Sequence, residues 1–77
     1  MAQYQGHRSW NAWNVALYIA NEEPLYRLAM DCLRNTPNLG AATNRFIRYS
    51  VLLGDRTPDG AVYNRTCIRE ALAGLRD

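Results

Sequence analysis

The chain has no lysine, a single histidine, two cysteines and no long apolar run, and each shortage excludes a class of protein. No apolar stretch approaches the ~20 residues that a membrane-spanning helix needs. No charged segment followed by an apolar one opens the chain, so the sequence shows no secretory signal. We therefore expect a cytoplasmic protein that makes no contact with a membrane.

Groups suited to catalysis or metal binding are also scarce. His7, Cys32 and Cys67 cannot complete a zinc site at any usual spacing, and no glycine-rich phosphate loop is present. Glu22 and Glu23 are adjacent, so they point ~100° apart on a helix and suit its positive end better than acid–base chemistry. We expect no enzymatic activity, no cofactor, and two cysteines that are buried free thiols.

What the sequence does contain is enough apolar material for one small folded domain. Hydrophobic residues make up 48% of the 77 positions, and eight of them are aromatic. This composition argues against disorder, and the length allows a single domain over residues 1–77. Residues 1–8 lack periodicity, and we expect them to be loosely ordered.

Capping residues and apolar stripes predict helices in the first half of the chain. Ser9 is a good N-cap for a helix that runs to about Ala20. Asn21 then resembles the cap of a second helix, with acidic residues and Pro24 in its first turn. The apolar stripe of this second helix predicts an end near Asn35.

The second half of the chain predicts two more helices separated by a structured turn. The third helix is expected over 39–53, with Gly54 as its left-handed C-terminal residue. Residues 57–60 read Thr-Pro-Asp-Gly, a compact turn in which Gly60 supplies positive φ. Asn64 is a plausible cap for a last helix over 65–75. The expected fold class is therefore all-α, a small bundle of three to four helices.

The first helix is apolar on nearly every side. At about 100° per residue, Trp10, Trp13 and Leu17 share one face, and Val15 and Ile19 lie on roughly the opposite one. Such a helix is normally buried on both sides, and in a chain this small we expect part of its surface to await a partner. The predicted core consists of Trp10, Trp13, Leu17, Leu25, Leu28, Phe46, Ile68 and Leu72.

All nine basic residues are Arg, and they are concentrated in the second half of the chain. Arg65, Arg69 and Arg76 fall within about 40° of one another on the last helix. One interpretation is a solvated face with Arg65 paired to Asp59. The other is a binding site for an acidic protein surface or for nucleic-acid phosphates, which two arginines of the third helix would extend if the helices are neighbours. The candidate partner-binding residues are Arg65, Arg69, Arg76, Arg45 and Arg48.

Two segments resemble a known group of proteins. SWNAWNVALYIANEEPLYRLA over 9–29 and RTPDGAVYNRTCIREALAGL over 56–75 are similar to small, mostly uncharacterised proteins of bacteriophages and mobile elements. Those proteins open with S/T-W-N-x-x-L-W/Y-I-x-N-D/E-x-x-L-Y and have a T-P-D-G-x-x-Y turn before the last helix. The chain departs from the pattern at Glu23-Pro24, where an acid and a glycine are expected. The opening segment also resembles phage and plasmid antirestriction-type proteins.

This resemblance implies a function in counter-defence. Small phage accessory proteins frequently disarm host defences, and a chain of this size without an enzyme signature is similar in kind to anti-CRISPR proteins. The leading hypothesis is a non-enzymatic inhibitor that binds a protein subunit of a CRISPR-Cas effector in the cytoplasm of the host bacterial cell. One alternative is a small DNA-binding regulatory protein that uses the Arg-rich last helix, although a net charge of +2 is low for that role. Another is a structural accessory protein that forms a homodimer through its Trp-rich first helix.

Overall fold

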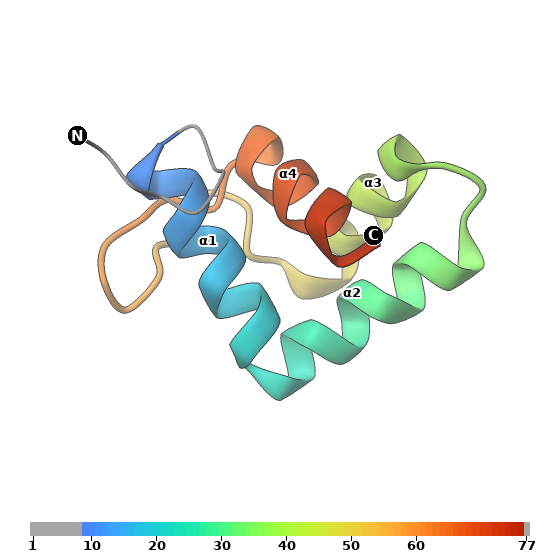
Figure 1. Cartoon of the computed structure of the whole chain (residues 1–77), viewed down its shortest axis with the longest axis horizontal. Coiled ribbons are helices and arrows are strands. Elements are labelled where there is room, and N and C mark those ends of the chain that lie inside the picture. The colour runs from blue at the N-terminus through green and yellow to red at the C-terminus, as the bar shows by residue number, and fades with distance from the viewer. Residues whose placement is uncertain (1–8, 77) are drawn as a thin grey trace.

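The computed structural model describes residues 9–76, and its architecture is four helices joined by short connections and one long loop (Figure 1). The helices are α1 (Trp10–Asn21), α2 (Glu23–Asn35), α3 (Leu39–Ser50) and α4 (Arg65–Arg76). The β pairing within residues 9–76 is limited to an isolated antiparallel bridge between Arg56 and Val62. The predicted all-α bundle is confirmed. The expectation of loose order over residues 1–8 lies outside the described residues.

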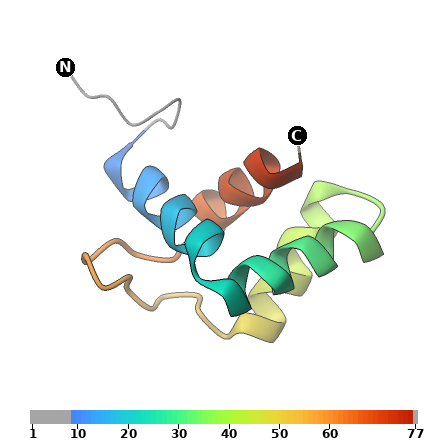
Figure 2. The same cartoon turned by 60° about the horizontal axis from the view of Figure 1, so that its bottom comes forward.

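Helix α4 holds the bundle together. It packs most extensively on α1 and also contacts α2 and α3, whereas α1 and α3 make no contact with each other within the described helices. Figures 1 and 2 show α4 lying across the bundle, with α1 on one side of it and α3 on the other. None of the described helices is long and apolar enough to cross a membrane.

The joint between α1 and α2 is a single residue. Ser9 caps α1 as predicted, because its Oγ accepts a hydrogen bond from the Ala12 N–H at 3.0 Å. Asn21 is the last residue of α1 rather than the cap of α2, so that part of the prediction is wrong. Glu22 ends α1 and begins α2 in an extended conformation, and no side chain caps α2. Pro24 lies in the first turn, where its missing N–H costs nothing.

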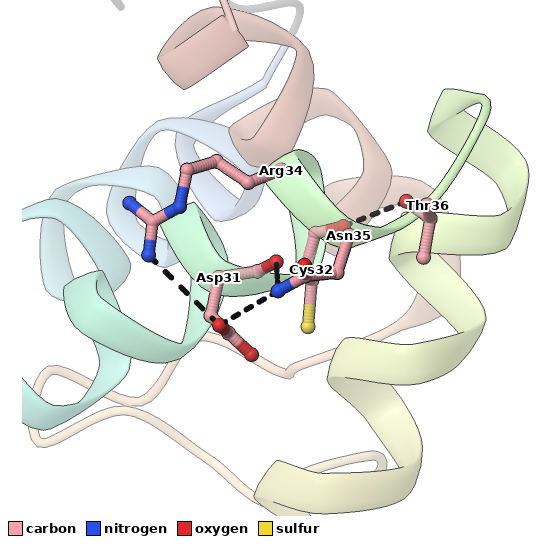
Figure 3. Close-up of polar contacts among 5 residues, drawn as sticks. All are labelled: Asp31, Cys32, Arg34, Asn35 and Thr36. Atoms are coloured by element: carbon pink, nitrogen blue, oxygen red, sulfur yellow. Dashed lines mark hydrogen bonds and ion pairs between the residues drawn. The ribbon is translucent and has the colours of Figure 1, made fainter.

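The end of α2 is closed by side chains of its own last turn (Figure 3). The Thr36 hydroxyl donates to the carbonyl of Cys32 at 2.6 Å. The Asn35 amide donates to the backbone carbonyl of Asp31 at 2.9 Å and to its carboxylate at 2.8 Å. The Arg34 guanidinium lies 3.9 Å from the same carboxylate. The Thr36 hydroxyl thus supplies a donor to the carbonyl of Cys32, one of the last four of the helix, and α2 ends at Asn35 as predicted.

Helix α3 is shorter than predicted. It ends at Ser50 rather than at Leu53, because Val51 adopts a left-handed conformation with φ of 55°. Gly54 does have positive φ, at 89°, but it belongs to the following loop, where its N–H donates to the carbonyl of Tyr63 at 2.8 Å. Gly54 therefore belongs to a turn in the loop, and the residue that ends the helix is the β-branched Val51.

The core lies between α4 and the three helices that pack on it. Phe46, Ile68 and Leu72 are fully buried, and Leu25 and Leu28 are partly buried against them. Cys32 and Cys67 are buried free thiols, which confirms the prediction. The other buried apolar side chains are Ala12, Val15, Ile19, Ala29, Ala42, Ala61, Tyr63 and Ala71.

The buried face of α1 is the one that contains Val15 and Ile19, not the tryptophan face. Trp10 is 40% exposed, so its assignment to the core is wrong. It occupies the first position of α1, at the end of the helix rather than over the middle of the bundle. Trp13 and Leu17 are only half-buried and line a surface groove beside α4.

Candidate functional site

A polar cluster joins α1 to the long loop between α3 and α4. The side chain of Asn14 is fully buried, and its Nδ2 donates to Oδ2 of Asp59 at 3.0 Å. The Thr57 hydroxyl donates to Oδ1 of Asn14 at 2.5 Å, and the Tyr18 hydroxyl donates to Oδ2 of Asp59 at 3.1 Å. Asp59 therefore binds α1, and the predicted pairing of Arg65 with Asp59 is wrong.

A second asparagine fixes the same loop one helical turn earlier. Nδ2 of Asn11 donates to the carbonyl of Val62 at 2.9 Å and to the Cys67 sulfur at 3.2 Å, while its Oδ1 accepts from the Val62 N–H at 2.7 Å. Asn11 and Asn14 are three residues apart and so lie on one face of α1. Sequence reasoning missed their role, although two asparagines on an otherwise apolar helix were the signal.

The phenols around this cluster are kept neutral. Partial burial, the hydrogen bond to Asp59 and the nearby negative charges raise the pKa of Tyr18. Burial raises the pKa of Tyr63, and the carboxylates of Glu22 and Asp55 act in the same direction. A neutral phenol is a hydrogen-bond donor, as the Tyr18 hydroxyl is toward Asp59, and these bonds hold the loop against α1.

The described residues contain no group of three or more His, Cys, Asp or Glu side chains that could hold a metal ion. Three exposed charged or apolar surfaces are candidates for a binding site. Two of these surfaces lie on α3 and α4, and a third lies between α1 and α4.

The predicted basic stripe lies exposed on α4. Arg65, Arg69 and Arg76 all face solvent. The guanidinium of Arg65 donates to Oδ1 of Asn44 on α3, which makes the two helices neighbours at this point. On α2, by contrast, Arg27 and Arg34 pair with acids of the same helix.

The arginines of α3 lie next to the beginning of that stripe. A surface hollow of about 270 Å³ runs along α3. Arg65 reaches its rim through Asn44, so the structure brings Arg65, Arg45 and Arg48 around one feature. Arg69 lies one turn further along α4, and Arg76 lies at the far end of that helix, ~16 Å from Arg65 along its axis. The residues lining the hollow are Thr36, Ala41, Asn44, Arg45, Arg48 and Tyr49.

An apolar groove of about 300 Å³ lies on the other side of α4, against α1. Trp13, Leu17 and Leu75 form its larger side chains. Small residues make up the rest of the lining, which leaves the groove open between the helices. These residues are Ala16, Ala20, Ala71 and Gly74.

Comparison with known proteins places the chain in a family. It belongs to DUF7249, a family of unknown function, whose model matches residues 1–73. The match covers residues 9–29 and all but the last two residues of 56–75, including Asn11, Asn14 and the Thr57–Gly60 turn. No curated protein matches the chain, and no solved structure matches it.

Proposed function

We propose that this protein is a non-catalytic binding domain whose partner is a protein, and that the binding surface is the arginine-bearing face of α4 together with the adjoining part of α3. The observation that carries the proposal is the exposed pair Arg65 and Arg69. These two side chains point the same way from successive turns of α4, and Arg65 extends to Asn44 on α3.

This pair costs the isolated domain stability. Like charges four residues apart on a helix repel each other, typically by 0.2–0.5 kcal/mol. Arg65 also begins α4, where a positive charge opposes the helix dipole, and the first turn contains no acidic residue to offset it. Carboxylates of a partner placed between the two guanidinium groups would relieve both effects, and Arg binds them in bidentate fashion.

The proposed target is a subunit of a CRISPR-Cas effector in the cytoplasm of a bacterial host. Its support is the resemblance of residues 9–29 and 56–75 to phage and mobile-element proteins, many of which act against host defences. In the structure these two segments are bound to each other through Asn11 and Asn14, so the resemblance extends over one continuous part of the fold. The domain would inhibit by occupying a surface that the effector needs.

A second candidate is a small DNA-binding regulatory protein. The same exposed stripe of Arg65, Arg69 and Arg76 supports it, because arginines on one helix face can contact successive phosphates. The low net charge of +2 favours the protein partner.

The test is charge reversal with a matched control. Arg65→Glu/Arg69→Glu should leave folding intact, because both side chains are exposed and a glutamate at the start of α4 suits the dipole. Arg27→Glu/Arg34→Glu makes the same change in net charge on α2 and disturbs only exposed ion pairs. The measurement is inhibition of CRISPR interference in cells that express each variant, beside thermal melts of the purified proteins.

We expect the α4 variant to lose inhibition while the α2 variant retains it. Wild-type protein that fails to inhibit interference would refute the CRISPR target. Equal inhibition by both folded variants would remove Arg65 and Arg69 from the binding surface. Tight binding of the wild type to DNA, with steep salt dependence, would support the regulatory alternative instead.

A further inference from the structure

The C-terminal end of α3 exposes three large apolar side chains within five residues. Tyr49 is 57% exposed, Val51 77% and Leu53 54%. Leu52, between the last two, packs against the core and holds the segment in place. Exposed apolar side chains that are close together in this way, unlike single ones scattered over a surface, are a candidate interaction site.

The backbone at this point is strained. Val51 has φ of 55°, a left-handed conformation that costs an L-residue with a branched Cβ more than almost any other type. A glycine or asparagine would end the helix there without that cost. The strained conformation instead leaves the Val51 side chain in solvent, which gains nothing in the isolated domain. The conformation ends α3, but ending the helix does not require a valine, so a valine kept there at this cost points to a binding role for its side chain.

Arginines border this apolar end on the side of the α3 hollow. The Arg45 guanidinium carbon lies 5.2 Å from the centre of the Tyr49 ring, so a positive charge is stacked on one of the three apolar residues. Arg48 is exposed one position before Tyr49 and lines the same hollow. The Nε of Arg45 is buried and has no hydrogen-bond partner among the described residues. The surface therefore combines apolar contact area with positive charge.

We propose that this surface, formed by Arg45, Arg48, Tyr49, Val51 and Leu53 and called here the α3 end, binds an acidic protein segment that carries apolar side chains. Carboxylates of the segment lie against the two arginines, and its apolar residues cover Val51 and Leu53. A nucleic-acid backbone matches the arginines but offers no aliphatic contact for those two side chains, so the combination favours a polypeptide. The inference rests on the proposed protein-binding function and identifies the chemistry of the partner.

The test uses the full chain and needs no knowledge of the natural partner. A library of random linear peptides is selected on the immobilised wild-type protein, and the affinities of enriched peptides are then measured by fluorescence anisotropy. Each peptide is measured against Arg48→Glu, against Val51→Gly and against Arg34→Glu, which reverses an exposed charge on α2 as a control. Val51→Gly relieves the strain while removing the side chain, so its loss of binding cannot be attributed to unfolding.

We expect enriched peptides to combine Asp or Glu with aliphatic or aromatic residues. Their binding should weaken about tenfold or more in Arg48→Glu and Val51→Gly, as for interface anchors, and should be unchanged in Arg34→Glu. Failure to enrich any peptide, enrichment of peptides without acidic residues, or equal binding to Val51→Gly would overturn the proposal. A single-stranded oligonucleotide that competes for the same surface would also overturn it.

The peptide test of the α3 end can fail independently of the CRISPR test of the proposed function. If peptides bind the α3 end but the protein does not inhibit CRISPR interference, the counter-defence target is refuted and the α3 end is still supported as a binding surface. Inhibition that persists in Arg48→Glu and Val51→Gly would refute the α3 end alone.

Discussion

Asn14 and Thr57 are separated by 43 residues in the sequence and joined by a 2.5 Å hydrogen bond in a part of the structure that is closed to solvent. Thr57 also accepts the N–H of Ala61 through the same Oγ1, so it links α1 to the turn that follows it. The loop between α3 and α4 thus has buried polar anchors in place of an extensive apolar core of its own. Figures 1 and 2 show this loop running out to the side of α1 before the chain returns to α4.

Asn14→Ala should destabilise the domain by about 2–4 kcal/mol, because it removes two hydrogen bonds and leaves the Thr57 hydroxyl without its acceptor. Urea denaturation would measure the loss, and hydrogen exchange should show reduced protection of the Thr57 and Ala61 amides. Asn44→Ala is the matched control, because Asn44 is exposed and its loss should cost no more than about 0.5 kcal/mol. Equal effects of the two substitutions would contradict the anchoring role.

Two glycines should respond to substitution in opposite directions. Gly60 has φ of 98°, which confirms the predicted left-handed turn residue, so Gly60→Val should destabilise by about 1–2 kcal/mol or more. Gly74 lies within α4 with open space around the position of a Cβ, so Gly74→Ala should stabilise by about 0.5–1 kcal/mol. Thermal melts of both variants measure the sign, and a destabilising Gly74→Ala would count against the description of α4.

The two tryptophans should differ in their contribution to stability. Trp13 is half-buried between α1 and α4, so Trp13→Ala should cost about 2–4 kcal/mol. Trp10 is 40% exposed, and Trp10→Ala should cost about 1 kcal/mol or less. Each variant retains one tryptophan, so fluorescence follows unfolding in both. A larger loss in Trp10→Ala would show that Trp10 packs in the core after all.

Stability should fall at alkaline pH. The folded-state pKa values of Tyr18 and Tyr63 are raised above the ordinary 10.0, so in the folded state these phenols keep their protons where the unfolded chain loses them. Their contribution is therefore complete below about pH 10 and is lost as the pH rises through the folded-state values. The thiol of Cys32, whose pKa burial raises above 9.0, adds to the same trend. Urea midpoints measured across this range should decline less steeply in Tyr18→Phe/Tyr63→Phe, and an unchanged slope would contradict the assignment.

Local signals in the sequence were sufficient to predict most of the helices. Ser9 and Asn64 cap α1 and α4 as expected, Asn64 through a 2.8 Å bond from the Cys67 N–H, because a cap depends only on residues within one turn. The end of α3 was placed at Leu53 since Gly54 resembled its C-terminal residue. The chain leaves the helix at Val51 instead, and no local preference of a valine predicts that.

The candidate site was less predictable because it depends on contacts between distant residues. The arginine stripe on α4 followed from helical periodicity alone. The partner of Arg65 could not be predicted from periodicity. Asp59 is nearer to Arg65 in the sequence than Asn44 is, but its carboxylate is already bound by Asn14 and Tyr18. In the sequence, Asn14 is only a polar residue in an apolar helix. Its partners, Thr57 and Asp59, become evident only from where the loop lies in the structure.

The packing of α1 on α4 has a consequence for how the protein is made. Helix α1 finds its principal neighbour in α4, which is synthesised only after α2 and α3, and the asparagines of α1 bind a loop that directly precedes α4. A nascent chain that has emerged only as far as α3 therefore exposes the part of α1 that α4 covers in the folded domain. Folding of this domain on the ribosome has to wait until α4 has left the exit tunnel, and the apolar surface exposed until then favours aggregation.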